Sequence, residues 1–155
     1  MTSQPEDGGK NAARFGVLVV AHGDLPGTLV KVVEKILGAK LDVEAVSVGW
    51  DDDMADSRLK IQEALKRAGQ GRGVLILTDM FGGTPTNVTL PFLKAEDVEI
   101  VTGVNLPMMV KVPNIQQGSG TLAEAADRLR DLGQAAIQLA THYLKKPPGG
   151  ASPAA

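Results

Sequence analysis

Short apolar runs alternate along the chain with amphipathic segments, and this pattern predicts a layered fold. The runs 15–21 (FGVLVVA) and 73–78 (GVLILT) are almost continuously apolar and rich in branched side chains, as is typical of parallel strands buried on both faces. The runs 43–48 and 98–102 each contain a glutamate, so we interpret them as flanking strands with one less buried face. The pattern predicts four strands and leaves a fifth open.

Apolar residues at helical spacing predict amphipathic helices between these strands. The first stripe consists of Leu29, Val32, Val33, Ile36 and Leu37. Asp24 precedes this stripe as a candidate N-cap, and Gly38 follows it as a terminating residue. A second stripe runs over 54–68, and a capping box at 121–124 opens a third, which we expect to form one long helix over 122–140.

The order of these elements predicts an open α/β fold. Alternating strands and helices require right-handed crossovers, which give a mostly parallel sheet with helices on both faces. At 155 residues, the chain has the length of one domain, which we place at 14–146. The ends, 1–13 and 147–155, are polar or rich in Pro, Gly and Ala, so we expect both to be disordered.

Composition and charge narrow the classes of function. A formal net charge of −2 offers little to attract nucleic acid. The chain has no cysteine and only two histidines, and the acidic cluster at 51–56 suits the start of a helix better than a metal site. We therefore expect neither a metal nor another cofactor. No apolar run reaches the roughly 18 residues of a membrane span, which favours a cytoplasmic protein without membrane insertion.

Two of the loops that follow the predicted strands contain unusual residues. His22 and Gly23 come directly after the first strand, and the loop 79–87 (DMFGGTPTN) follows the third. Ligands of open parallel sheets bind beyond the carboxyl ends of the strands. If these two central strands are neighbours, Asp79 comes within reach of His22.

This pair predicts a histidine that carries a phosphoryl group. A carboxylate that accepts the proton of one imidazole nitrogen leaves the other nitrogen with an outward lone pair, as in a base or a nucleophile. Free backbone N–H groups of a glycine-rich turn bind tetrahedral anions. The phosphate-binding residues that we predict are Gly23, Gly82, Gly83, Thr84 and Asn87.

Other chemistries fit the spacing less well. A P-loop needs a lysine after its second glycine, and a dinucleotide fingerprint must follow a strand, whereas the glycine-rich segment 69–73 precedes one. A hydrolase built on the same pair lacks the G-x-S-x-G elbow and would have only Thr84 or Thr86 as its nucleophile. The second histidine, His142, lies near the end of the last predicted helix, and we interpret it as a surface residue.

Four sequence blocks occur in a characteristic order within residues 15–146. They are Ala21-His22-Gly23, Ile36-Leu37-Gly38, the 79–87 loop, and Gly103 to Met108 (GVNLPM). In these blocks the chain resembles the mannose-type (mannose, fructose and sorbose) enzyme IIA domains of the bacterial phosphoenolpyruvate-dependent sugar phosphotransferase system.

The resemblance implies a function in phosphoryl transfer. It implies that His22 accepts a phosphoryl group from the phosphohistidine of the carrier protein HPr and passes it to an enzyme IIB. Asp79 then matches the aspartate that orients the histidine, and Thr84 matches the hydroxyl residue of the phosphate-binding turn. The resemblance also implies a homodimer.

Two alternatives to the transport function are left open. One is a regulatory module whose His22 phosphorylation state is read by a non-transport partner. The other is the phosphocarrier subunit of dihydroxyacetone kinase, which is similar in fold but usually has His-Ser in the first motif, whereas Gly23 and the segment 82–85 favour the sugar branch. The sequence leaves open the sugar, and whether the chain is a separate subunit or one domain of a larger IIAB protein.

A histidine that transfers phosphate must be reached by the histidine of another protein, so its rim should be apolar. The candidate docking residues are Leu25, Met80, Phe81 and Met108, since methionine suits surfaces that accept more than one partner. For Met108 and its neighbour Met109, packing under the end of the sheet is the competing interpretation.

Overall fold

The computed structural model describes residues 14–95 and 97–144. The terminal segments 1–13 and 147–155, for which the sequence predicts disorder, lie outside the described residues, as do positions 145 and 146 of the predicted domain.

Four parallel strands form one sheet in the order β2-β1-β3-β4. The strands are β1 (Gly16–His22), β2 (Glu44–Val48), β3 (Val74–Thr78) and β4 (Val98–Thr102). These bounds confirm the four predicted strands to within one residue at each end. The two most apolar strands, β1 and β3, are neighbours in the centre of the sheet, which is the arrangement that a contact between His22 and Asp79 requires.

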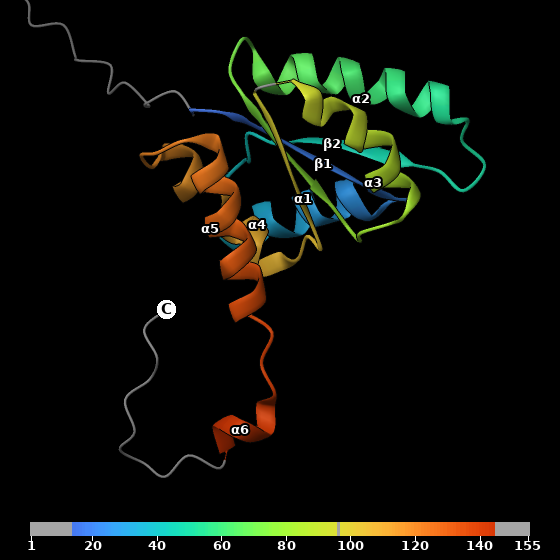
Figure 1. Cartoon of the computed structure of the whole chain (residues 1–155). Coiled ribbons are helices and arrows are strands. Elements are labelled where there is room, and N and C mark those ends of the chain that lie inside the picture. Colours follow the sequence, from blue (N-terminus) through green and yellow to red (C-terminus); the bar gives the residue numbers. More distant parts are fainter. Residues whose placement is uncertain (1–13, 96, 145–155) are drawn as a thin grey trace, which may run out of the picture.

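Helices cover both faces of the sheet (Figure 1). One face carries α1 (Leu25–Leu37), α4 (Leu106–Gln117) and α5 (Leu122–Ala135), and the other carries α2 (Met54–Gly69) and α3 (Thr84–Thr89). A 3-10 helix, η1 (Leu90–Lys94), continues α3, and the short helix α6 (Ala140–Leu144) comes last. The predicted open α/β class with helices on both faces is confirmed.

The core is divided into two layers by the sheet, because successive strand residues point to opposite faces. Val19 of β1 packs in a buried cluster with residues of α1, α4 and α5. Its neighbour Val20 packs in a second cluster with residues of α2 and α3. The sheet is therefore held from both sides, and its carboxyl edge is a rigid base for the loops that follow.

The starts of α1 and α2 show what the acidic residues do. The carboxylate of Asp53 accepts hydrogen bonds from the backbone N–H groups of Ala55 and Asp56 at 2.7 and 3.3 Å, so the acidic cluster begins a helix as predicted. Asp24 occupies the N-cap position of α1, but its side chain makes no capping hydrogen bond there.

The prediction of one long helix over 122–140 is wrong. The capping box is present, but α5 ends at Ala135, and α6 begins only at Ala140. The buried residues of α5 end at Gly133, and the described residues from 134 onward are exposed. With no sheet left to cover, the apolar positions of this segment no longer stabilise a helix.

Helix α4 was not among the predicted helices. Two prolines, Pro107 and Pro113, interrupt its sequence, and proline is a poor helix former except in the first turn. Tertiary packing compensates for this, because Asn105 caps α4 through the Met108 N–H and α4 packs on α5. A Cβ at Gly133 would lie only 2.6 Å from the sulfur of Met108, so this glycine permits the close approach of the two helices.

Among the residues that the structure describes, no helix is long and apolar enough to cross a membrane.

Candidate functional site

The site forms where β1 and β3 end at the carboxyl edge of the sheet. His22 is the last residue of β1, and Asp79 is the first residue after β3. The parallel register pairs Val20 with Thr78, so Asp79 follows opposite Ala21, and His22 lies one residue further along the neighbouring strand. This placement brings together residues that are 57 positions apart in the chain.

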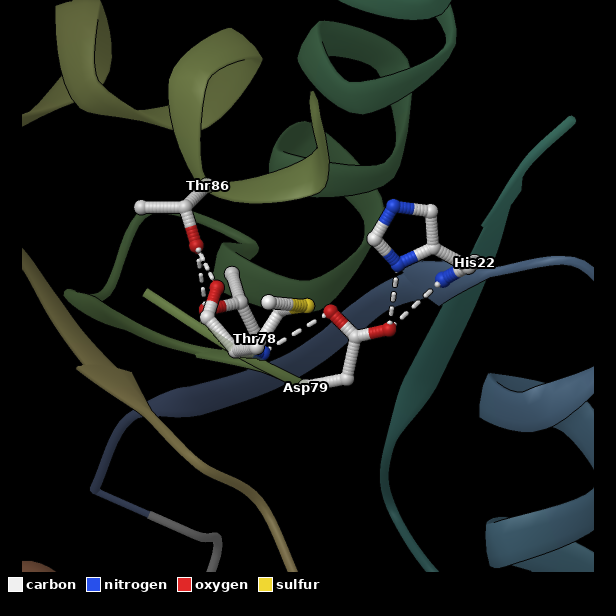
Figure 2. Close-up of polar contacts among 5 residues, drawn as sticks. His22, Thr78, Asp79 and Thr86 are labelled. Atoms are coloured by element: carbon white, nitrogen blue, oxygen red, sulfur yellow. Dashed lines mark hydrogen bonds and ion pairs between the residues drawn. The ribbon is translucent and has the colours of Figure 1, made fainter. Parts of the chain in front are cut away.

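Asp79 fixes His22 through two hydrogen bonds to one carboxylate oxygen (Figure 2). The backbone N–H of His22 donates to Asp79 Oδ2 at 3.0 Å, and the ring nitrogen Nδ1 lies 2.7 Å from the same oxygen. An ionised carboxylate only accepts hydrogen bonds, so Nδ1 carries the proton in this contact. The other ring nitrogen, Nε2, points away from Asp79 and keeps its lone pair.

The surroundings of Asp79 favour its charged form. Partial burial acts to raise the pKa of this carboxyl, but hydrogen bonds from the His22 backbone, the His22 ring and the Met80 N–H outweigh burial, so the pKa is lowered from its usual value. The side chains of His22 and Asp79 are 22% and 13% exposed. The pair is sheltered, and the imidazole is still accessible from solvent.

A glycine turn closes around the edge of the imidazole. A Cβ placed on Gly83 would lie 3.0 Å from His22 Cε1 and 3.6 Å from Nε2, so the backbone comes close to the ring only because no side chain is present. Gly82 has a φ of +81°, which favours glycine over other residues. Gly83 thus brings the main chain close to the ring edge that contains Nε2, and Gly82 provides the turn before it.

A buried chain of hydroxyls anchors the loop that carries Asp79. Thr86 Oγ1 donates to the carbonyl oxygen of Met80 at 2.6 Å. Its proton is then committed, so the Thr78 hydroxyl donates to Thr86 Oγ1 at 2.9 Å. Figure 2 shows these contacts beside the Asp79 carboxylate. Thr78 and Thr86 are almost fully buried, and Thr86 is therefore a structural residue with no room to act as a nucleophile.

The other predicted phosphate-binding residues lie near this turn. Gly23 has a φ of +53° and donates its N–H to the carbonyl of Val48 at 3.0 Å. Thr84 and Asn87 are exposed residues of α3, and the Asn87 N–H donates to the Gly83 carbonyl at 3.0 Å. Their role in phosphate binding stays a prediction.

Three of the four predicted docking residues are exposed. Leu25, Met80 and Phe81 are 41%, 55% and 76% exposed. Met108 is only 2% exposed, and Met109 is fully buried. The assignment of Met108 to a docking surface is wrong, because its side chain fills the layer between α4 and α5 opposite Gly133.

One aromatic residue at the site was missed by the sequence reasoning. The indole of Trp50, in the loop between β2 and α2, stacks on the His22 imidazole with ring centroids 5.2 Å apart and an interplanar angle of 20°. Trp50 belongs to none of the apolar runs or helical stripes from which the elements were predicted. Its position directly after the β2 strand, at the same sheet edge as His22, is the signal that could have identified it.

The described part of the chain contains no group of three or more His, Asp or Glu side chains that could hold a metal ion. His142 lies in the exposed helix α6.

Comparisons with known proteins identify the family of the chain. The family model described as "PTS system fructose IIA component" matches residues 16–129. The fructose-specific EIIA component of Bacillus subtilis (strain 168) is 30% identical over 134 residues, which cover 85% of this chain and 90% of that protein. The mannose-specific EIIAB component of Escherichia coli (strain K12) is 31% identical over 103 residues, which cover 63% of this chain and 30% of that protein.

A solved structure shows the same fold. The mannose/sorbose-specific IIA subunit of the phosphotransferase system from Enterococcus faecalis superposes with a TM-score of 0.74 and 26% sequence identity, over 81% of this chain and 94% of that one. The chain therefore belongs to the mannose- and fructose-type enzyme IIA family, whose members are phosphotransfer components of the sugar phosphotransferase system.

Proposed function

We propose that His22 accepts a phosphoryl group from phospho-HPr on Nε2 and passes it to an enzyme IIB. The observation that carries this proposal is the 2.7 Å contact between His22 Nδ1 and Asp79 Oδ2. It assigns the proton to Nδ1 and leaves Nε2 as the nucleophile. The family membership supports a phosphotransfer role, and the geometry supports this nitrogen as the acceptor.

The transfer to His22 requires no proton to be added or removed. The lone pair of Nε2 forms a bond to phosphorus while the bond between phosphorus and the donor histidine breaks, and the donor nitrogen takes that electron pair. The attacking and leaving nitrogens lie in line on either side of the phosphorus. The His22 ring keeps its Nδ1 proton and becomes cationic. Asp79, held in its charged form, stabilises that cation. In the second transfer the bond between Nε2 and phosphorus breaks, Nε2 takes back its electron pair, and the acceptor receives the phosphoryl group.

The glycine turn supplies the remaining part of the site. The main chain at Gly83 comes close to the imidazole edge that contains Nε2, and free N–H groups in such a turn hold phosphate oxygens. Thr84 and Asn87 are exposed next to this turn, which supports their predicted part in binding the transferred group.

Two proteins must reach the same nitrogen in turn, and the apolar rim supports this. Phe81, Met80 and Leu25 expose apolar surface around the site, and exposed apolar patches of this kind mark interaction surfaces. HPr as donor and an enzyme IIB as acceptor are the partners proposed.

A homodimer belongs to the same proposal. In the described part of the chain, β4 is an edge strand, and Leu90 and Leu93 of the neighbouring η1 are 40% and 43% exposed. An open sheet edge beside exposed leucines suits association with a second copy. Light scattering coupled to size-exclusion chromatography should give twice the 16.2 kDa chain mass, and a value at the chain mass would reject the dimer.

The function is tested by following phosphate through the relay. The protein is incubated with labelled phosphoenolpyruvate, enzyme I and HPr, and the acid-labile phosphate bound to it is measured. We expect uptake in the parent and in His142→Ala, and none in His22→Ala with an unchanged circular dichroism spectrum. Phosphate uptake by His22→Ala would reject the assignment, and so would a loss of uptake in His142→Ala while His22→Ala still takes up phosphate.

A further inference from the structure

The indole of Trp50 is exposed, yet it is placed over the reactive histidine. Trp50 is the single tryptophan of the chain, and its side chain is 82% exposed. A large apolar side chain left in water contributes little to the stability of its own fold. Among the residues that the structure describes, its one ring contact is the stack on His22. The placement therefore needs a reason other than folding.

Local structure holds Trp50 in that place. The register of the sheet pairs His22 with Val48, so the loops after β1 and β2 start side by side. The next residue, Gly49, donates its N–H to Asp52 Oδ2 at 2.9 Å, and Lys60 lies 3.4 Å from the same oxygen. The hydrogen bond from Gly49 is the main reason that the pKa of Asp52 is lowered. Trp50 thus projects from a turn that is held by a hydrogen bond and an ion pair.

The close approach within this turn depends on a missing side chain. A Cβ on Gly49 would lie 2.7 Å from Asp52 Oδ1, so any side chain at this position would push the Asp52 carboxylate away from its present place. The resulting tight turn separates β2 from α2 and places Trp50 above the imidazole. A larger residue at position 49 would therefore require the Asp52 side chain to shift.

The stacked geometry suits phosphoryl transfer in two ways. The lone pair of Nε2 lies in the plane of the imidazole, so an indole over one face leaves the line of attack open. The imidazole becomes cationic when phosphorylated, and the face of an indole attracts a cation. Three contacts then define the ring: Asp79 at Nδ1, the Gly83 backbone beside Cε1, and Trp50 on one face.

We propose that Trp50 is a positioning residue for phosphoryl transfer, which holds the His22 ring in the orientation set by Asp79 and stabilises the ring once it is phosphorylated. The proposal rests on the proposed function in naming His22 as the phosphoryl acceptor. It assigns to Trp50 an effect on the rate of the transfer step itself, which should be similar whichever donor is used.

The test uses a small donor beside the protein donor. Phosphoramidate phosphorylates histidine chemically and needs no docking surface, so it separates positioning of the ring from contact with HPr. Rates with both donors are compared for the parent, Trp50→Leu and Trp50→Phe, with Leu59→Ala as a control because Leu59 is also an exposed apolar residue, at 60%. Trp50→Leu keeps apolar bulk but has no aromatic face, and Trp50→Phe restores one.

We expect Trp50→Leu to lower the maximal rate with phospho-HPr and the second-order rate constant with phosphoramidate, each about threefold to tenfold. Trp50→Phe should recover most of that loss, and Leu59→Ala should match the parent. A change confined to the apparent KM for phospho-HPr, with a normal phosphoramidate rate, would overturn the proposal and make Trp50 a docking contact. A rate loss that Trp50→Phe does not recover would also overturn it.

A spectroscopic measurement tests the stack without any donor. The ring current of the indole shifts the proton resonances of the His22 imidazole, and Trp50→Leu should remove that shift in the unphosphorylated protein. Unchanged His22 resonances would overturn the stacked arrangement. If the parent accepts phosphate from phosphoramidate but not from phospho-HPr, the proposed donor fails, while the comparison of the Trp50 variants with phosphoramidate still decides the positioning role.

Discussion

Adding one methyl group at Gly83 should impair phosphoryl transfer without destabilising the fold. Gly83 has φ −80° and ψ 169°, which any residue adopts, so Gly83→Ala meets no backbone strain. Its new Cβ would lie 3.0 Å from His22 Cε1 and 3.2 Å from Met80 Cγ. Met80 is exposed and can move, but His22 is held by Asp79 at 2.7 Å. The imidazole must shift by a few tenths of an ångström.

The neighbouring glycine provides the matched control. Gly82 has a φ of +81°, and a Cβ there would meet no atom within 4 Å. Gly82→Ala therefore strains the backbone at a cost of about 1 kcal/mol and leaves the imidazole untouched. In a protein of this size, that cost lowers the melting temperature by roughly 2 to 4 °C.

Gly83→Ala should mainly lower the transfer rate, whereas Gly82→Ala should mainly lower the stability of the fold. Gly83→Ala should keep its free energy of unfolding within about 1 kcal/mol of the parent, because reduced freedom of the unfolded chain offsets a weaker N-cap. Its single-turnover rate with phospho-HPr should fall about tenfold, since catalysis is sensitive to displacements of this size. Denaturant unfolding and rapid-quench phosphorylation measure the two effects. A parent-like rate in Gly83→Ala would refute the close approach of this turn to His22.

Three further predictions concern Asp79, Phe81 and Thr86. Asp79→Asn should slow transfer. Because the folded pKa of Asp79 is lowered, the stability that its charge contributes is present above about pH 4 and is lost as the pH falls through the folded value. The difference in free energy of unfolding between parent and Asp79→Asn, measured in urea, should therefore be smaller at pH 3 than at pH 6, and an equal difference would contradict this. Phe81→Ala should raise the apparent KM for HPr while the melting temperature stays near that of the parent, whereas a large stability loss with normal transfer would place Phe81 in the core. Thr86→Val should lower the free energy of unfolding by about 1 to 3 kcal/mol, because it leaves the buried Thr78 hydroxyl without its acceptor, and thermal unfolding should show Thr86→Ser closer to the parent.

The sheet and the catalytic pair were predictable because they depend on strong local signals. The apolar runs that form β1 and β3 exclude other interpretations, and parallel pairing then fixes the level at which both strands end. His22 ends β1 and Asp79 directly follows β3, so both side chains lie at the same edge of the sheet. Predicting this pair required no tertiary contact other than the pairing of two adjacent strands.

The features that were missed depend on tertiary packing. Helix α4 has prolines in a weakly periodic sequence and is stabilised by its contact with α5, which also explains why Met108 is buried rather than exposed. The stack of Trp50 on His22 depends on the tight turn at Gly49 and on the register of β2 with β1. Neither is encoded in the spacing of apolar residues.

The most direct test of the account identifies the nitrogen that carries the phosphoryl group. Phosphorus–proton and nitrogen NMR of the labelled phosphoprotein, with His22→Ala and His142→Ala as assignment controls, distinguishes the two nitrogens of each histidine ring. The hydrogen bond from Nδ1 to Asp79 predicts a single acid-labile phosphoryl group on Nε2 of His22. A phosphoryl group on Nδ1 of His22, on His142, or as an acid-stable ester on Thr84 would contradict it.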